Sequence, residues 1–145
     1  MIPDIGVHHD KRSDGSEIWW LDGILHREDG PAVIHADGTQ HWYQKGKHHR
    51  VGGPAITRTD GTEIWVVNDL YHREDGPAFI DPEICQEWWK NGQRHREDGP
   101  AIVWAGSCQE WFFKGKRHRE DGPAITFFDG YQEWWLNGVR QKVSR

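Results

Sequence analysis

A heptapeptide that recurs at a fixed interval constrains the fold of this chain more than any other feature. The segment His-Arg-Glu-Asp-Gly-Pro-Ala is complete at residues 26–32, 72–78, 95–101 and 118–124, and it is degenerate at 49–55. Each copy begins 23 residues after the one before it, as from His26 to His49. Such regular self-similarity is the signature of a repeat protein, in which each unit packs mainly on its neighbours.

A tryptophan recurs with the same period and fixes the repeat boundaries. The six members of this row are Trp19, Trp42, Trp65, Trp88, Trp111 and Trp134. The two patterns together predict a single repeat domain over residues 1–145. It consists of a partial first repeat (1–25), five fuller repeats (26–48, 49–71, 72–94, 95–117 and 118–140) and a tail (141–145).

Within each repeat the pattern is that of a β-hairpin. A short run of β-forming residues follows the Gly-Pro, and an Asp-Gly pair such as Asp37-Gly38 then predicts a two-residue hairpin turn with positive φ. A second strand follows and ends at another turn signal, such as Asn91-Gly92. No helical periodicity is present, and Gly or Pro interrupts every longer window. The expected fold is all-β: an elongated, solenoid-like array of about six hairpins in a twisted, antiparallel, single-layer sheet.

Composition bears on the class of partner and on location. Only 35% of the residues are apolar, yet ten tryptophans argue against disorder. The net charge of −5 disfavours nucleic acid, which would require a basic stripe. No stretch approaches the roughly 20 apolar residues of a membrane span. The first residues lack the charged and apolar regions of a secretory signal. These features predict a cytoplasmic protein, in the host cytoplasm if it is viral.

The 23-residue unit resembles the MORN (membrane occupation and recognition nexus) repeat. The closest stretches are residues 111–118, Trp-Phe-Phe-Lys-Gly-Lys-Arg-His, and residues 42–49. The chain departs from the family in having Gln-Glu-Trp-Trp before the turn and Glu-Asp-Gly-Pro-Ala after the His. It is similar to a divergent variant of phage, giant-virus and bacterial proteins. The resemblance implies an extended hairpin array that binds a protein or lipid, without catalysis.

The recurrent His and Glu-Asp residues could suggest metal or acid–base chemistry, but a structural role is favoured. Histidines one repeat apart should lie about 10 Å apart, whereas ligands of one zinc ion each lie about 2.1 Å from it. We therefore expect each His to hydrogen-bond the next hairpin. We expect each Asp to accept backbone N–H groups in a turn, and each Arg to pair with neighbouring carboxylates along the array. No catalytic, cofactor-binding or metal-binding residue is predicted.

Alternation along a strand places the two tryptophan-containing rows on opposite faces. The invariant row, Trp19 to Trp134, is predicted to form the structural core. The next residue of each repeat is Trp20, Tyr43, Val66, Trp89, Phe112 or Trp135. This second row is either buried or open as a binding stripe, and an open aromatic stripe could also stack single-stranded bases.

Function in a repeat protein is expected where the copies differ. Large apolar residues at such positions predict a partner-binding surface, consisting of Leu70, Tyr71, Trp104, Phe127 and Phe128. The expected function is a non-catalytic protein-binding module, and the resemblance suggests a phage-type inhibitor of a host or defence protein. The alternative is a protein that sequesters a small ligand such as a nucleotide. Its aromatic and basic side chains would include Lys114, Lys116, Arg117 and Arg119.

The two cysteines, Cys85 and Cys108, occupy equivalent positions in adjacent repeats. Equivalent atoms two strands apart lie about 9–10 Å from each other, beyond the roughly 7 Å Cα separation that a disulfide spans. Both thiols are therefore predicted to be free, at tolerated surface or strand positions.

Overall fold

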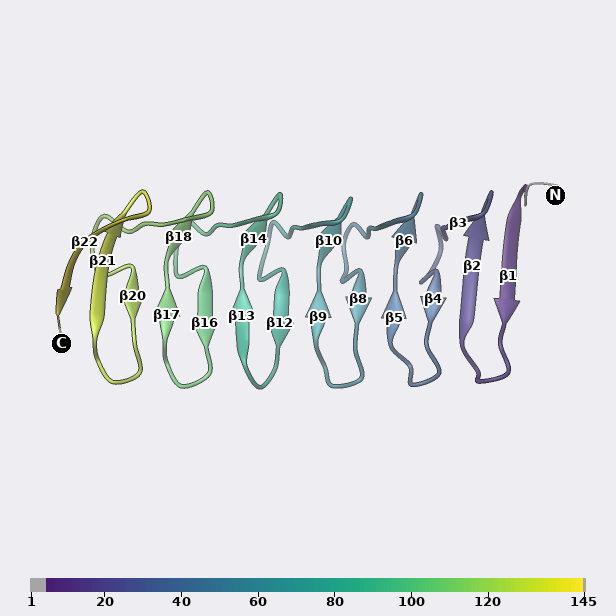
Figure 1. The fold of residues 1–145 in the computed structure, drawn as a ribbon, viewed down its shortest axis with the longest axis horizontal. Helices are drawn as coiled ribbons and strands as arrows, with labels where there is room; N and C mark the ends of the chain where they lie inside the picture. The colour runs from purple at the N-terminus through teal and green to yellow at the C-terminus, as the bar shows by residue number, and fades with distance from the viewer. Residues whose placement is uncertain (1–4, 145) are drawn as a thin grey trace. The chain divides into compact units, whose positions relative to one another are not determined.

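The computed structural model describes residues 5–144, and they form strands, turns and loops without a helix. The chain divides into two compact units, Met1–Leu70 and Tyr71–Arg145. Each unit contains an open antiparallel sheet, and Figure 1 shows its strands running side by side in one layer. The all-β hairpin fold is thus confirmed. None of the described residues forms the long apolar helix that would cross a membrane.

The sheet of the first unit begins with its longest hairpin and continues with short strands. Its spatial order is β1 (Val7–Lys11), β2 (Glu17–Leu21), β4 (Val33–Ile34), β5 (Gln40–His41), β8 (Ile56–Thr57) and β9 (Glu63–Ile64). The remaining strands up to the unit boundary are β3 (Ile24–Leu25), β6 (Tyr43–Gln44), β7 (Lys47–His48), β10 (Val66–Val67) and β11 (Leu70–Tyr71). Strand β3 pairs with β2, and β6 pairs with β7.

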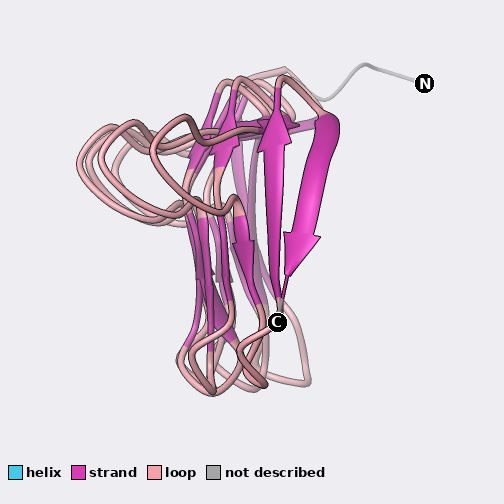
Figure 2. Cartoon of the chain, turned by 90° about the vertical axis from the view of Figure 1, so that its left-hand side faces the viewer, coloured by secondary structure: helices cyan, strands magenta, loops and turns pink. Residues whose placement is uncertain are grey.

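The second unit repeats this plan and ends in a long hairpin. Its sheet order is β12 (Phe79–Asp81), β13 (Cys85–Glu87), β16 (Ile102–Trp104), β17 (Gln109–Glu110), β20 (Ile125–Thr126), β21 (Gln132–Leu136) and β22 (Val139–Ser144). Two short hairpins lie outside the main sheet, β14 (Trp89–Lys90) with β15 (Gln93–Arg94) and β18 (Phe112–Phe113) with β19 (Lys116–Arg117). Figure 2 shows loops bulging from one side of the strands.

The Asp-Gly turns differ from the predicted two-residue form. In the turn of Asp37, the N–H of His35 donates to the carbonyl of Thr39, so three residues separate the closing pair. Gly38 has a φ of 96°, whereas Asp37 has no positive φ. The Asp37 carboxylate instead accepts the N–H of Thr39 at 2.8 Å. A turn followed by a left-handed Gly is typical of hairpins with three-residue loops. The predicted two-residue turn was therefore wrong.

The second turn of each repeat is the two-residue one. In the second unit, Asn91 and Gly92 have φ values of 49° and 78°, and Lys90 pairs directly with Gln93. Two successive left-handed residues match the twist of the flanking strands, and Asn-Gly tolerates that conformation best. Each of these turns lies a few residues before a His-Arg-Glu-Asp-Gly-Pro-Ala loop.

Small and aliphatic residues form the buried core. The heptapeptide alanines Ala32, Ala55, Ala78, Ala101 and Ala124 are each 0% exposed. Aliphatic partners at 9% exposure or less are Ile18, Ile64, Val66, Ile102 and Ile125. The invariant tryptophans are half-buried. The fully enclosed core therefore consists of residues that flank the tryptophan row.

Candidate functional site

The heptapeptide arginine folds back over the tryptophan that precedes it by eight residues. In the second unit the guanidinium carbon of Arg96 lies 4.0 Å from the ring centroid of Trp88, and Arg119 covers Trp111 at the same distance. Arg27 and Arg50 do the same in the first unit, on Trp19 and Trp42. A guanidinium stacked on an indole is favourable both electrostatically and by dispersion.

The rest of the loop holds this arginine in place. Arg96 donates from Nε to Oδ1 of Asp98 at 3.1 Å and from Nη1 to the carbonyl of Pro100 at 3.1 Å. A Cβ at Gly99 would lie 2.7 Å from the guanidinium carbon of Arg96. The Arg, Asp, Gly and Pro of the heptapeptide thus form one clamp around the tryptophan.

Each recurrent histidine joins its loop to the next hairpin. His95 Nδ1 accepts the backbone N–H of Lys114 at 2.9 Å, and His118 accepts that of Asn137 at 3.0 Å. The donor always lies 19 residues later and is the first left-handed residue of the next turn. These bonds confirm the structural role predicted for the histidines. Within residues 5–144, no three His, Cys, Asp or Glu side chains are placed to hold a metal ion.

The Glu-Asp pairs behave differently from the prediction. Each Asp pairs with the Arg of its own loop, as in Arg119–Asp121 at 2.9 Å, and in these pairs does not cap a turn or bridge to a neighbouring repeat. The reason is that the arginine is already folded back over its tryptophan, within reach of the Asp two residues on. Glu97 and Glu120 remain 74% and 84% exposed at the loop surface.

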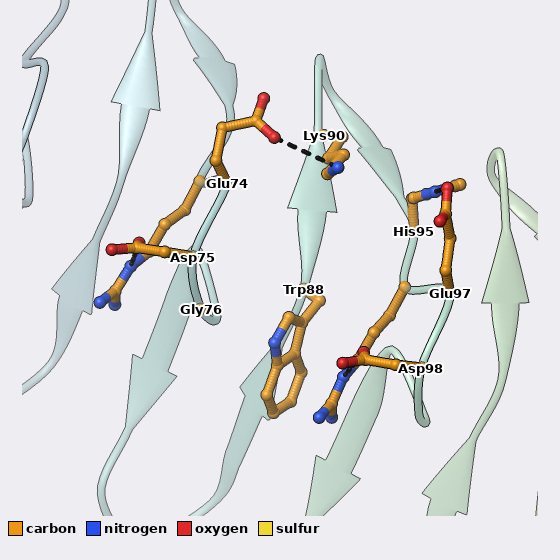
Figure 3. Close-up of a pocket in the computed structure, with 10 residues that line it drawn as sticks. Glu74, Asp75, Gly76, Trp88, Lys90, His95, Glu97 and Asp98 are labelled. Atoms are coloured by element: carbon orange, nitrogen blue, oxygen red, sulfur yellow. Dashed lines mark hydrogen bonds and ion pairs between the residues drawn. The ribbon is translucent and has the colours of Figure 1, made fainter.

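Two pockets lie between successive loops of the second unit. The Trp88 pocket, about 430 Å³, lies between residues 73–76 and 95–98 and is also lined by Trp88 and Lys90. Figure 3 shows Trp88 between the two loops, with Lys90 reaching Glu74. The Trp111 pocket, about 480 Å³, lies between residues 96–98 and 118–121, and Trp111 and Phe113 line it.

The opposite side of the same strands carries a second surface, which we call the aromatic face. It consists of Trp89, Trp104, Phe112 and Trp135 together with Arg94 and Arg117. Arg94 lies 4.9 Å from the Trp89 centroid and 5.6 Å from that of Phe112. Arg117 similarly lies between Phe112 and Trp135, at 5.8 and 5.3 Å. Aromatic rings and guanidinium groups therefore alternate along this face.

Three carboxylates beneath the aromatic face fix these side chains. Glu87 accepts hydrogen bonds from Trp89 Nε1 at 2.9 Å and from Arg94 Nε at 3.0 Å. Glu110 accepts from Arg117 and, at 3.4 Å, from Trp104 Nε1. Glu133 accepts from Trp135 Nε1 at 2.7 Å. Sequence reasoning missed these glutamates, although their recurrence one residue before Trp88, Trp111 and Trp134 was a usable signal.

The predicted partner-binding residues are only partly brought together. Trp104 belongs to the aromatic face, and Phe127 occupies the equivalent position one repeat later, packed on Tyr131. Phe128 follows at 83% exposure. Tyr71 meets the edge of Trp89, with 5.3 Å between centroids. Leu70 lies in the first unit and is 48% exposed.

The basic residues proposed for a nucleotide pocket do not converge. Arg119 is stacked on Trp111, whereas Arg117 pairs with Glu110 on the aromatic face. Lys114 lies over Phe113 at 5.4 Å and Lys116 is exposed. The pockets between the loops are instead bordered by carboxylates, which would repel a phosphate.

A histidine cluster takes the place of the glutamates in the first unit. His41 Nδ1 lies 3.0 Å from His48 Nε2, and the His35 ring meets that of His41 edge-on. Burial, followed by the nearby His48, His35 and Arg58, lowers the pKa of His41 to about 4. Burial also lowers the pKa of His48, although Asp69 opposes this.

This cluster predicts a loss of stability in mild acid. The unfolded chain binds a proton at His41 below about pH 6.5, whereas the folded protein does so only near pH 4. The free energy of unfolding should therefore fall across that interval, by on the order of 1–2 kcal/mol because water screens a half-buried ring. Urea unfolding between about pH 7 and about pH 4.5 measures the loss.

His41→Ile is the matched control, since Ile18 and Ile64 occupy the same position in neighbouring repeats. It should flatten the pH dependence over that interval. An unchanged pH profile in this variant would contradict the assignment to His41.

The two thiols are free, and Cys85 is buried. Burial raises the pKa of Cys85 to about 11, with Glu87 and Asp81 adding to the effect. Cys85 lies on strand β13, in agreement with the predicted strand position, and it is buried there, as is Thr62 at the equivalent position with 1% exposure. A thiol with so high a pKa has little thiolate character at neutral pH.

No protein-family model matches this chain, and no curated protein matches it.

Proposed function

We propose that this chain is a non-catalytic repeat module that binds another protein through the aromatic face of its second unit. The alternation of tryptophan, phenylalanine and arginine side chains on one face is the observation that carries the proposal. Tryptophan, tyrosine and arginine are enriched among the residues that dominate protein–protein binding energy. Half-buried side chains such as these retain area to contact a partner.

The hydrogen bonds beneath the face also favour binding. Glu87 and Glu110 fix Arg94 and Arg117 before a partner arrives. Ordering a long side chain on binding costs about 0.5–1.5 kcal/mol, so prior ordering reduces that cost. A flexible surface lysine would not offer this advantage.

The resemblance to MORN repeats supports the same class of function, and it adds the narrower hypothesis of a phage-type inhibitor of a host or defence protein. The nucleotide-sequestering alternative has less support, because carboxylates surround the pockets between the loops. Location in the cytoplasm belongs to this proposal as well.

Co-purification from a lysate of the source cell tests the proposal. The tagged protein should retain one stoichiometric protein partner. Trp104→Ala should reduce recovery of that partner about tenfold, which is the size of effect expected when a residue that dominates an interface is truncated. Gln109→Ala is the control, because the exposed Gln109 side chain points away from the aromatic face.

Two results would refute the proposal. One is a partner whose recovery depends on Gln109 and is unaffected by Trp104→Ala. The other is the absence of any stoichiometric protein, with a bound nucleotide in its place, which would restore the sequestering role.

A further inference from the structure

We infer that the Trp111 pocket receives an arginine side chain from the partner protein. That the arginine comes from a partner protein rests on the proposed protein-binding function. The inference concerns the side of the strands that carries the loops, opposite the aromatic face, and it follows from charge, from aromatic lining and from a comparison between two pockets of the same unit.

The charge balance of the Trp111 pocket is negative. Four carboxylates line it, from Glu97, Asp98, Glu120 and Asp121, against two guanidinium groups and the imidazole of His118. Arg96 and Arg119 are each already paired with the Asp of their own loop, at 3.1 and 2.9 Å. Glu97 and Glu120 instead contact the imidazoles of their own loops, His95 at 3.4 Å and His118 at 3.6 Å. Their charge is not matched by a guanidinium group of the lining, and a cation entering between them would be attracted.

The lining of the pocket also suits a planar cation. Trp111 and Phe113 both border it, and aromatic faces attract guanidinium groups. Arginine can stack on an aromatic ring while it donates two parallel hydrogen bonds to a carboxylate, which lysine cannot do. Within the fold itself, Arg119 stacks on Trp111 and donates one hydrogen bond from Nε to Asp121. Lys114 approaches Phe113 at 5.4 Å, but it is exposed and lies outside the pocket lining.

The Trp88 pocket provides an internal comparison. Its loops have the same sequence, but Lys90 stands where the Trp111 pocket has Phe113. The ammonium group of Lys90 lies 3.2 Å from Glu74 and lowers the pKa of that carboxyl. Figure 3 shows this lysine directed toward Glu74. The Trp88 pocket thus supplies its own cation, whereas in the Trp111 pocket an aromatic ring replaces it.

A titration followed by nuclear magnetic resonance tests the inference. The probe is the peptide acetyl-Gly-Gly-Arg-Gly-Gly-amide, and the readout is the Trp111 indole N–H, assigned by its loss in Trp111→Phe. The expected result is a saturable shift with a dissociation constant in the millimolar range, on the order of 1 mM for a single side chain. The same peptide with neutral citrulline in place of arginine should give no saturable shift.

Exchange of the two lining residues makes the test specific. Phe113→Lys should weaken peptide binding about tenfold or more, since it introduces the tethered cation. Lys90→Phe should give the Trp88 indole a saturable shift that the original protein lacks. Both substitutions are at strand positions that the other residue already occupies in a neighbouring repeat, so the fold should tolerate them.

Three results would overturn the inference. These are the absence of a saturable Trp111 shift, an equal response of the Trp88 and Trp111 indoles in the original protein, and tighter binding of the corresponding lysine peptide. Because the probe is synthetic, any of these would leave binding through the aromatic face untouched. Conversely, a lower recovery of the partner protein with the Trp104→Ala variant would report on the aromatic face and would not depend on the Trp111 pocket.

Discussion

Trp88→Ala should lower the free energy of unfolding by about 3 kcal/mol, the low end of the range for large aromatic residues in a core. The ring is half-buried, so part of its area stays in contact with water. Its loss also removes the stacking surface of Arg96, which now lies 4.0 Å from the ring centroid. The backbone N–H of residue 88 can still donate to the Ala101 carbonyl, so the hairpin ladder is retained. Urea unfolding followed by circular dichroism measures the change.

Gln86→Ala is the control for this substitution. Gln86 lies on β13, two residues before Trp88, and it is exposed. An exposed strand position of this kind should change the free energy of unfolding by no more than about 0.5 kcal/mol. A Trp88→Ala variant that unfolds at the same urea concentration as the control would contradict the stabilising role of the tryptophan row.

Ala101→Leu should destabilise the protein by about 2–3 kcal/mol, through overpacking instead of cavity formation. Ala101 is 0% exposed and is followed by Ile102 at 2%. The carbonyl of Ala101 accepts the N–H of Trp88 at 2.8 Å, so its backbone cannot shift outward without breaking that bond. The three added carbon atoms therefore have no space. Thermal unfolding and urea unfolding should both show the loss.

Ala105→Leu separates side-chain size from position. Ala105 lies in the exposed turn after β16, where a larger side chain projects into solvent. Its effect should stay within about 0.5 kcal/mol. Equal destabilisation by the two leucine variants would show that the heptapeptide alanine is not a packing constraint.

The fold could be predicted from the sequence because the repeats are regular. The 23-residue period defined the hairpins and assigned the recurrent histidines to hydrogen bonds with the next hairpin, because both depend on contacts between adjacent repeats. The heptapeptide arginine was harder to place. Its position over Trp88 depends on the path of the loop from Arg96 to Pro100, and no periodicity encodes that path.

The turn and the core show where pattern reasoning was insufficient. Asp37-Gly38 is compatible with two hairpin turns, and the choice depends on the Asp37 carboxylate accepting the N–H of Thr39. The tryptophans were predicted to form the core because they never vary, yet the enclosed positions belong to alanine and isoleucine. The functional surfaces depended on single differences between copies, such as Lys90 against Phe113. A difference of that kind gains meaning only when both pockets are seen.

The bond from each histidine to a backbone N–H 19 residues later has a consequence for how such a gene can change length. A duplication or deletion of one whole period leaves every histidine with a donor in the same place, because the first residue of this turn is left-handed in each repeat. The insertion or deletion of one residue within a strand would instead turn each following side chain to the other face. Recombination between the repeated coding segments should therefore yield folded proteins in steps of 23 residues. Each step within the second unit should add or remove one pocket between loops and one segment of the aromatic face.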